Sequence, residues 1–481
     1  MTNELSNLKY PKVFQYFWEI SQIPRGSGNT AAITQYLLSF ANEHKLEHHI
    51  SGENNIIIIK DASPSKVNSP AIILQGHTDM VCEKKPDSNH DFSSDPLDLY
   101  IDGDFLGAKG TTLGGDDGIA VAYMLALLSD KQLELPRLEC IFTYDEEIGM
   151  IGAGQIDLSP CTGKLMINLD SETEGEFIIG CAGGVRLSSS FDIEKEEQEG
   201  YLLTISVSGL MGGHSGEAIH LGGANAIKLV GRFVNRLTWG GAFLVDYTAG
   251  NADNVIPKSC TAKLLLPKDN NSWAEEYINT VSEFIHDEYD GIESNLLIEY
   301  TIDSNLSRQM VVKSSYARNA IDALVDLQDG VIEWEADGLQ VKTSTNLGII
   351  KLTDATFSMD CLLRSSNNQE KEKLLEDMKK CVSYTGGKCS TSGSYSGWTP
   401  SANSTLQKGM VKLWKDMFGI LPEVQSIHAG LECGILCGKK PDLDIVSIGP
   451  NILDIHTPDE LLDIPSTIRV YEFLCNFLTS Q

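Results

Sequence analysis

Two kinds of hydrophobic pattern alternate in the first third of the chain. Apolar residues recur with the spacing of a helix face at 13–23 and 29–44. Residues 118–128 are apolar on every side, which predicts a helix that is covered all round. Short unbroken apolar runs, typical of strands buried on both faces, lie at 56–59, 71–74, 139–143 and 164–169. This alternation predicts an α/β fold with a mostly parallel central sheet.

The pattern changes near residue 184. Half-alternating segments, typical of strands with one buried face, occur at 202–209, 260–267, 295–302 and 355–364. Helical stretches at 223–237 and 272–289 lie between them. After a turn-rich return linker at 391–400, the α/β pattern resumes with a helix at 404–418 and a strand at 444–448. We therefore expect an α+β domain at 184–394, inserted between two parts of the first domain, 1–183 and 395–481.

Composition limits the kinds of binding partner and the cellular compartment that can be expected for this protein. The 481 residues include 37 Lys and Arg against 67 Asp and Glu, a formal charge of -30 that disfavours nucleic acid and anionic membrane surfaces. No signal peptide and no apolar run of the ~18 residues needed for a membrane span is visible. The eleven cysteines are dispersed and form no CxxC pair, as in a reducing compartment. A cytoplasmic location is expected.

Side chains of the types that can bind metals follow the predicted strands or precede the apolar helix. These residues are His77, Asp79, Asp116, Asp117, Glu146, Glu147, Asp170, Glu172 and His456. In open parallel sheets, sites form beyond the carboxyl ends of the strands, so these positions are expected to converge. Imidazoles and carboxylates suit a borderline metal such as zinc, and two such ions can share a bridging carboxylate and a water molecule.

Each of these signals also has a structural interpretation. A single histidine after a strand is often a hydrogen-bonded structural residue, and Asp116-Asp117 can cap the helix that follows. Glu146-Glu147 can form a solvated turn. Their occurrence together, at equivalent ends of successive elements, favours the metal site.

The motifs in order resemble the aminoacyl-histidine dipeptidases, or cytosolic non-specific dipeptidases, within the aminoacylase-like group of two-metal peptidases. The resemblance runs nearly end to end and is carried by IPRGSGN, HTDMV, TTLGGDDGIA, DEEIGMIGA, NLDSE, GGHSG, HAGLECG, IGPNILDIHTP and HTPDE. One departure is Asp117, where relatives often have Asn. The resemblance implies a di-zinc exopeptidase-like catalytic domain with an inserted α+β lid domain. It also implies hydrolysis of unblocked dipeptides, including Xaa-His types such as carnosine.

The resemblance assigns the metal ligands residue by residue. Asp116 would bridge two divalent ions, most naturally zinc, although manganese and cobalt also suit such ligands. His77 and Asp170 would complete one site, and Glu147 and His456 the other. Glu146 would be the general base, and Asp79 would orient the His77 ring.

Further residues would contact substrate from the inserted domain and from HAGLECG. His214 would stabilise the oxyanion, or it is a buried hydrogen-bonded histidine. Asn254 and Arg364 would hold the substrate carboxylate; alternatively, Asn254 caps a turn and Arg364 is a solvated charge on an edge strand. Glu432 would receive the substrate ammonium, or it is a surface carboxylate at a helix start.

Two other functions are alternatives. An N-acyl amino-acid amidohydrolase would use the same metal site, and hydrolysis of free against N-blocked dipeptides separates the two activities. A non-catalytic binding protein of the same fold would be expected to lack the base or a ligand, yet Glu146 and all five ligand positions are present. The G-x-S-x-G, Walker and H-E-x-x-H signatures are missing from the sequence. The expected partners are small peptides, and either a monomer or a homodimer is compatible with the sequence.

Overall fold

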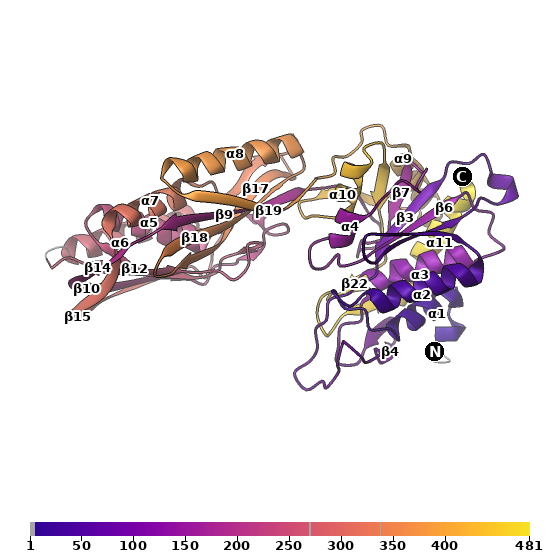
Figure 1. Cartoon of the computed structure of the whole chain (residues 1–481), viewed down its shortest axis with the longest axis horizontal. Coiled ribbons are helices and arrows are strands. Elements are labelled where there is room, and N and C mark those ends of the chain that lie inside the picture. Colours follow the sequence, from indigo (N-terminus) through magenta and orange to yellow (C-terminus); the bar gives the residue numbers. More distant parts are fainter. Residues whose placement is uncertain (1–4, 269–270, 337) are drawn as a thin grey trace. The chain divides into compact units, whose positions relative to one another are not determined.

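The chain forms two compact units, each with its own core. The computed structural model describes residues 5–268, 271–336 and 338–481 (Figure 1). Unit 1 comprises Met1–Gly180, Trp398–Ser426 and Leu431–Gln481, and unit 2 comprises Cys181–Gly397 and Ile427–Gly430. Unit 1 is therefore discontinuous in sequence.

Unit 1 is built on an eight-stranded sheet of order β1-β2-β6-β3-β7-β21-β8-β20. Its strands are β1 (Glu47–Ser51), β2 (Asn55–Lys60), β3 (Ile72–His77), β6 (Leu138–Thr143), β7 (Leu165–Asn168), β8 (Glu176–Cys181), β20 (Glu423–Ile427) and β21 (Asp444–Ser447). The central strands β6, β3, β7 and β21 run parallel, whereas β1–β2, β2–β6 and β21–β8 are antiparallel pairs. The parallel centre confirms the predicted α/β class.

Helices cover this sheet because their apolar faces match it. They are α1 (Pro11–Ser21), α2 (Ala31–His44), α3 (Gly115–Ser129), α4 (Ile151–Gln155), α9 (Thr405–Phe418), α10 (Glu432–Lys439) and α11 (Ile464–Ser480). Every residue of α3 is buried, as its apolar sequence predicts. This helix packs against both α1 and β3 (Figure 1). The start of α3 is thereby fixed close to the sheet.

A second, small sheet in unit 1 holds a loop that matters for the site. Its order is β22-β23-β5-β4, with β22 (Ile452–Leu453), β23 (Leu461–Asp463), β5 (Phe105–Ala108) and β4 (Leu99–Asp102). Strands β22 and β23 pair in antiparallel fashion. The loop that joins them contains His456 and Glu460.

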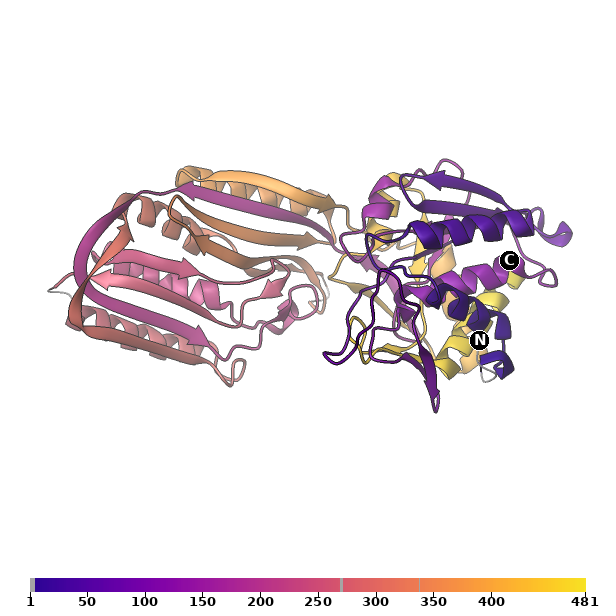
Figure 2. The ribbon, with the colours of Figure 1, turned by 60° about the horizontal axis from the view of Figure 1, so that its bottom comes forward.

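The described residues of unit 2 form three sheets, with orders β12-β14-β10-β15, β16-β17-β18-β9-β19 and β11-β13. The strands are β9 (Gly183–Asp192), β10 (Lys195–Ser208), β11 (Gly213–His214), β12 (Phe243–Thr248), β13 (Val255–Ile256), β14 (Cys260–Leu266), β15 (Leu297–Val312), β16 (Gly330–Trp334), β17 (Val341–Leu352), β18 (Thr356–Ser365) and β19 (Lys388–Tyr395). The helices are α5 (Ala226–Trp239), α6 (Asn271–Glu288), α7 (Ser314–Asp326) and α8 (Asn368–Tyr384). They lie along one side of the strands (Figure 2), and α5, α7 and α8 contribute to one apolar core with them.

One predicted segment differs from the structure. The return linker expected at 391–400 is wrong over its first half, because residues up to Tyr395 belong to β19, which pairs with β9. Strand β19 lies at the edge of its sheet and is mostly exposed. Its Ser, Thr and Gly residues therefore lack the apolar alternation by which a half-buried strand is detected. Within the described part of the chain, no helix is long and apolar enough to cross a lipid bilayer.

Candidate metal centre

The parallel strands of unit 1 deliver ligand-type residues to one edge of the sheet. Strand β3 ends at His77, the segment after β6 carries Glu146 and Glu147, and Asp170 lies two residues after β7. Because β3 lies between β6 and β7 in parallel register, these three carboxyl ends are neighbours. Strand β21 is parallel to β7 and leads towards the loop of His456.

These side chains form two groups that share Asp116. In the first group, His77 Nε2 lies 3.0 Å from Asp116 Oδ1 and 3.4 Å from Asp170 Oδ1. In the second, His456 Nε2 lies 3.1 Å from Asp116 Oδ2 and 3.1 Å from Glu147 Oε2. Within each group, the candidate ligand atoms all lie within 4.8 Å of one another. Asp116 therefore presents one oxygen to each group, as a carboxylate that bridges two cations must.

The crowded carboxylates of this cluster would be more stable with bound cations than without them. Burial, followed by the charges of Asp116 and Asp170, raises the pKa of Glu172 to about 8. Hydrogen bonds with Asp116 and then Glu147 raise the pKa of His456 to about 11. Several carboxylates thus crowd a space in which they destabilise one another's charged form. Bound divalent cations would relieve that repulsion, and the imidazole and carboxylate donors suit zinc or a similar metal.

Asp79 contacts both the His77 ring and the loop of the two glutamates. Its Oδ1 lies 3.4 Å from His77 Nδ1 and accepts the Glu146 N–H at 3.0 Å. Its Oδ2 accepts the Glu147 N–H at 3.3 Å and the Ser27 hydroxyl at 2.8 Å. Asp79 is therefore placed to orient the His77 ring. It also fixes the backbone of Glu146 and Glu147, which the sequence did not suggest.

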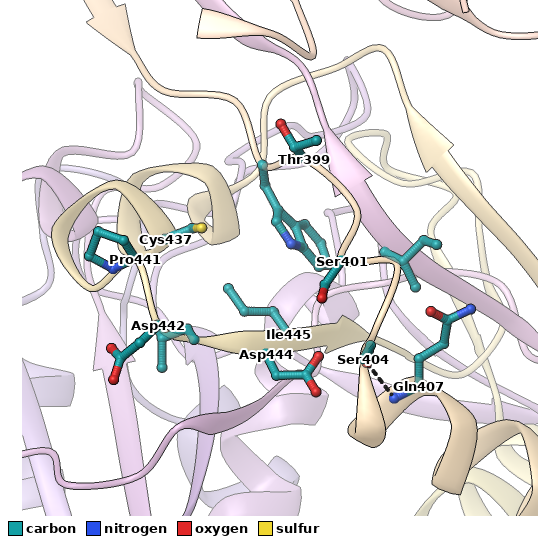
Figure 3. Close-up of a pocket in the computed structure, with 12 residues that line it drawn as sticks. Thr399, Ser401, Ser404, Gln407, Cys437, Pro441, Asp442, Asp444 and Ile445 are labelled. Atoms are coloured by element: carbon teal, nitrogen blue, oxygen red, sulfur yellow. Dashed lines mark hydrogen bonds between the residues drawn. The ribbon is translucent and has the colours of Figure 1, made fainter. Parts of the chain in front are cut away.

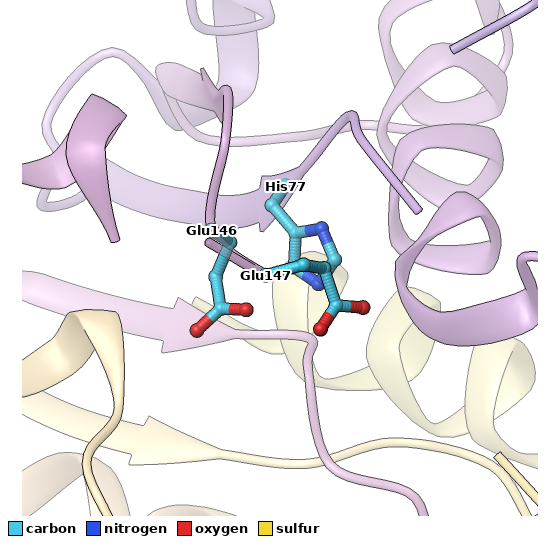
Figure 4. A group of neighbouring side chains, drawn as sticks. All are labelled: His77, Glu146 and Glu147. Carbon is cyan, nitrogen blue, oxygen red and sulfur yellow. The ribbon is translucent and has the colours of Figure 1, made fainter. Parts of the chain in front are cut away.

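Glu146 and Glu147 are adjacent in sequence, and both carboxylates lie near the His77 ring (Figure 4). Glu147 belongs to the group of His456, whereas Glu146 belongs to neither group that shares Asp116 but forms a third group with His77 and Glu147. Burial raises the pKa of Glu146 well above its ordinary value, and the charges of Asp170 and Glu432 act in the same direction although His77 opposes them. A carboxylate with a raised pKa is a better proton acceptor.

Glu432 stands at a helix start, but it is not a surface residue. Its side chain is fully buried at the beginning of α10, and its Oε2 accepts from Gln75 Nε2 at 2.5 Å and from Thr143 Oγ1 at 2.6 Å. Burial raises its pKa to about 7. The surface interpretation is therefore wrong, while its contact with the substrate ammonium stays a prediction.

Arg364 is not a solvated charge on an edge strand, which was the alternative interpretation of this residue. It lies on β18, the middle strand of its sheet, and is buried. Its Nη1 donates to the Tyr395 hydroxyl at 3.1 Å, while its buried Nε has no hydrogen-bond partner within the described ranges. A buried guanidinium with an unused donor is expected to bind an anion.

His214 and Asn254 lie near each other in unit 2. Strands β11 and β13 pair so that His214 is opposite Val255, and the Asn254 carbonyl accepts the Ser215 N–H at 2.8 Å. The His214 ring is about one-third exposed, and its Nδ1 has no hydrogen-bond partner among the residues described. Burial, followed by the charge of Arg364, lowers its pKa. This partly exposed ring, whose Nδ1 makes no hydrogen bond, does not fit the alternative of a buried, hydrogen-bonded structural histidine.

Three residues support the ligands in ways that the sequence pattern does not indicate. Arg25 and Glu460 are almost fully buried and hold the loops around the cluster. Asp117 Oδ2 accepts the His77 N–H at 3.0 Å. Arg25 and Glu460 stand inside IPRGSGN and HTPDE, so their presence in shared motifs was the available signal. Their partners are backbone atoms, which a side-chain pattern does not reveal.

Unit 1 also has a pocket of about 270 Å³ at the other end of β21 (Figure 3). Trp398, Ser401, Cys437 and Asp444 are among the residues that line it. Asp444 begins β21, whereas the ligand cluster lies beyond the ends of the parallel strands. The pocket is therefore separate from the candidate metal centre.

Comparison with known proteins places this arrangement in a family. The model of peptidase family M20/M25/M40 matches residues 73–480. The chain belongs to this family. It is 33% identical over 487 residues to the cytosol non-specific dipeptidase of Escherichia coli strain K12, with 99% of each protein covered.

Solved structures of other peptidases share the fold. The crystal structure of aminoacylhistidine dipeptidase from Vibrio alginolyticus has a TM-score of 0.91 and 33% identity, and covers 99% of this chain and 98% of its own. Aminopeptidase PepT from Bacillus cereus has a TM-score of 0.62 at 15% identity, over 98% of each chain. The first comparison confirms the family resemblance drawn from the motifs, and the second extends the likeness of fold to a more distant peptidase.

Proposed function

We propose that this chain is a metal-dependent dipeptidase that hydrolyses unblocked dipeptides, including Xaa-His types such as carnosine. The observation that carries the proposal is the pair of ligand groups that share Asp116, with Glu146 beside them and outside both. The 33% identity over almost the full length to a cytosol non-specific dipeptidase supports the substrate class. The same relative supports a cytoplasmic location.

His77, Asp116 and Asp170 would hold one divalent ion, and Asp116, Glu147 and His456 the other. When bound, the ions supply a water of lowered pKa and neutralise the charge of the carboxylates. Zinc suits these donors, and manganese or cobalt would also fit them. Metal analysis of the purified protein, followed by reconstitution with each ion in turn, identifies the ion that supports turnover.

Glu146 would act as the general base. It takes a proton from the attacking water while the new C–O bond forms at the peptide carbonyl carbon. It then delivers this proton to the amide nitrogen as the C–N bond breaks, which releases a neutral amine. Asp79 would keep the base in place, because it accepts the N–H of Glu146 itself.

Residues of unit 2 and α10 would recognise the two ends of the substrate. Arg364 has an unused, buried donor that suits the substrate carboxylate, and Asn254 would add an amide donor. His214 would stabilise the oxyanion. Glu432 would receive the substrate ammonium at Oε1, which has no hydrogen-bond partner among the described residues, while its Oε2 accepts from Gln75 and Thr143.

A paired assay tests the proposal. Metal-reconstituted protein is offered β-alanyl-histidine, ordinary dipeptides and N-acetylated dipeptides, with Glu146→Gln alongside. We expect turnover of the free dipeptides and a loss of about 10²–10⁴-fold in kcat for the variant, with its metal content unchanged. Turnover of N-acetylated substrates alone would move the assignment to an N-acyl amino-acid amidohydrolase, and an active Glu146→Gln would remove the base from the mechanism.

A further inference from the structure

Two buried charges hold the backbone that carries the ligands, although neither can itself be a ligand in this arrangement. Glu460, on the loop between β22 and β23, uses both carboxylate oxygens. Its Oε2 accepts the N–H groups of Leu113 at 2.8 Å and Gly114 at 2.9 Å. Its Oε1 accepts those of Gly115 at 2.7 Å and Asp116 at 3.4 Å. Four consecutive amides, ending at the shared ligand, thus converge on one carboxylate.

Arg25 holds the same loop from its carbonyl side. Its Nη2 donates to the Gly114 carbonyl. Its Nη1 donates to the carbonyls of Thr78 at 3.0 Å and Asp79 at 3.1 Å, directly after the ligand His77. The side chain is 2% exposed. One guanidinium therefore connects the segment after His77 to the segment before Asp116.

The sequence around Asp116 leaves room for this guanidinium. A Cβ atom on Gly114 would lie 2.6 Å from Arg25 Nη2, and one on Gly118 would lie 2.5 Å from the same atom. Both distances are too short for a non-bonded contact, so a larger residue at either position would displace Arg25. Two glycines of LGGDDG are thus explained by the guanidinium that they accommodate.

We propose that Arg25 and Glu460 are positioning residues of the metal centre, which set the affinity for the ions by fixing the backbone of Asp116 and of the segment that follows His77. This inference rests on the metal centre of the proposed function. A ligand held in place before the ion arrives loses less conformational freedom on binding. Residues that orient ligands commonly change metal affinity about 10–100-fold when they are replaced.

Substitution of Glu460 by Gln tests the proposal while the side-chain shape is kept. The amide NH₂ that replaces one oxygen would face two backbone N–H donors, so at least two of the four hydrogen bonds are lost. We expect the Kd for zinc, measured by competition with a chelator, to rise about 10–100-fold. Arg25→Lys, which keeps the charge but not the planar fork, is expected to weaken binding in the same way.

Glu139→Gln is the matched control. Glu139 is also a fully buried carboxylate of unit 1 that accepts two backbone N–H groups, those of Thr162 and Gly163. It lies near the start of β6, whereas the ligands follow the ends of the strands. We expect this variant to lose stability but to keep the wild-type zinc affinity. Equal zinc affinity in the wild type, Glu460→Gln and Arg25→Lys would overturn the inference.

Hydrogen exchange of the metal-free wild type gives a test that needs no variant. We expect the amides of Leu113, Gly114 and Gly115 to be protected after chelation, since Glu460 holds them without the metal. Fast exchange that slows only when zinc is added would overturn the inference, because the ion would then order the loop. Neither readout involves a peptide. A wild type that binds zinc but cleaves no dipeptide would therefore refute the proposed activity alone, and one that binds no metal would refute both.

Discussion

Asp117 lies beside the shared ligand Asp116 and has a different task. Its Oδ2 accepts the His77 N–H, and burial, with the charge of Asp170, raises its pKa well above the ordinary value. An asparagine oxygen can accept the same N–H. We expect Asp117→Asn to change the free energy of unfolding by less than about 1 kcal/mol and to keep the metal content of the wild type.

Asp117→Ala provides the contrast. It leaves the buried His77 N–H without an acceptor, which costs about 1–3 kcal/mol. Denaturant unfolding of the two variants under identical metal loading measures the difference. Similar destabilisation by Asn and Ala would show that the hydrogen bond to His77 is not the contribution of this side chain.

His428 in unit 2 makes stability depend on pH. Burial, followed by the charge of Arg364, lowers its pKa to about 4, and its Nε2 is 2.7 Å from Ser344 Oγ. Between pH 6.5 and 4, the unfolded chain binds a proton that the folded chain does not, so stability falls as the pH falls through this window. His428→Gln removes this contribution. We expect the stability difference between wild type and variant to shrink from pH 7 to pH 4.5 in denaturant titrations, whereas a constant difference would contradict the assigned pKa.

The convergence of the candidate ligands could be predicted because most of these side chains stand at the end of a recognisable element. The roles of Arg25 and Glu460 could not, since their partners are carbonyl and N–H groups that every sequence contains. Arg364 and Glu432 show a further limit. Their burial follows from tertiary packing, so the sequence left the surface alternatives open for both.

At the scale of elements, the start of α5 depends on one side chain. The Asn225 Oδ1 accepts the N–H of Ile227 at 3.0 Å, and its Nδ2 donates to the Leu347 carbonyl at 2.9 Å. Asn225→Ala removes the cap and the hydrogen bonds that Asn225 Nδ2 donates to the Leu347 carbonyl and to Asp329 Oδ1. We expect a loss of about 1–3 kcal/mol, measured as a lower Tm of unit 2. Asn225→Asp keeps the cap acceptor but sets an oxygen against Asp329 Oδ1 and the Leu347 carbonyl, to both of which Asn225 Nδ2 donates, so it is expected to lose at least as much; a much smaller loss would show that the cap is the main contribution of Asn225.

Element types were predictable where burial is uniform. The continuous apolar runs became β2, β3, β6 and β7, and the helix that is apolar all round became α3. The sequence pattern predicts a linker over part of strand β19, because an exposed edge strand has little apolar periodicity. Long strands such as β10 and β15 extend well beyond their predicted cores, since their outer residues pair through the backbone rather than through buried side chains.

For the whole molecule, every proposed metal ligand belongs to unit 1. A ligand stabilises only the unit whose folded form binds it, by about 2.7 kcal/mol at a concentration of 100 times Kd. We expect calorimetry to resolve two unfolding transitions, and chelation to lower the Tm of only one. Readdition of zinc should restore that transition. An equal shift of both transitions would place metal-dependent stability outside unit 1.

The position of β21 has a consequence for biosynthesis. This strand lies between β7 and β8 in the sheet, yet the ribosome makes it only after all of Cys181–Gly397. At about 5–20 residues per second, the ribosome needs tens of seconds to pass from β8 to β21. During this time the eight-stranded sheet of unit 1 lacks the strand between β7 and β8, while unit 2 can already fold. His456 follows later still, so an ion cannot find the complete ligand set until the chain has been made at least as far as that residue. During that interval, the exposed edges of β7 and β8 are where a chaperone would be needed most.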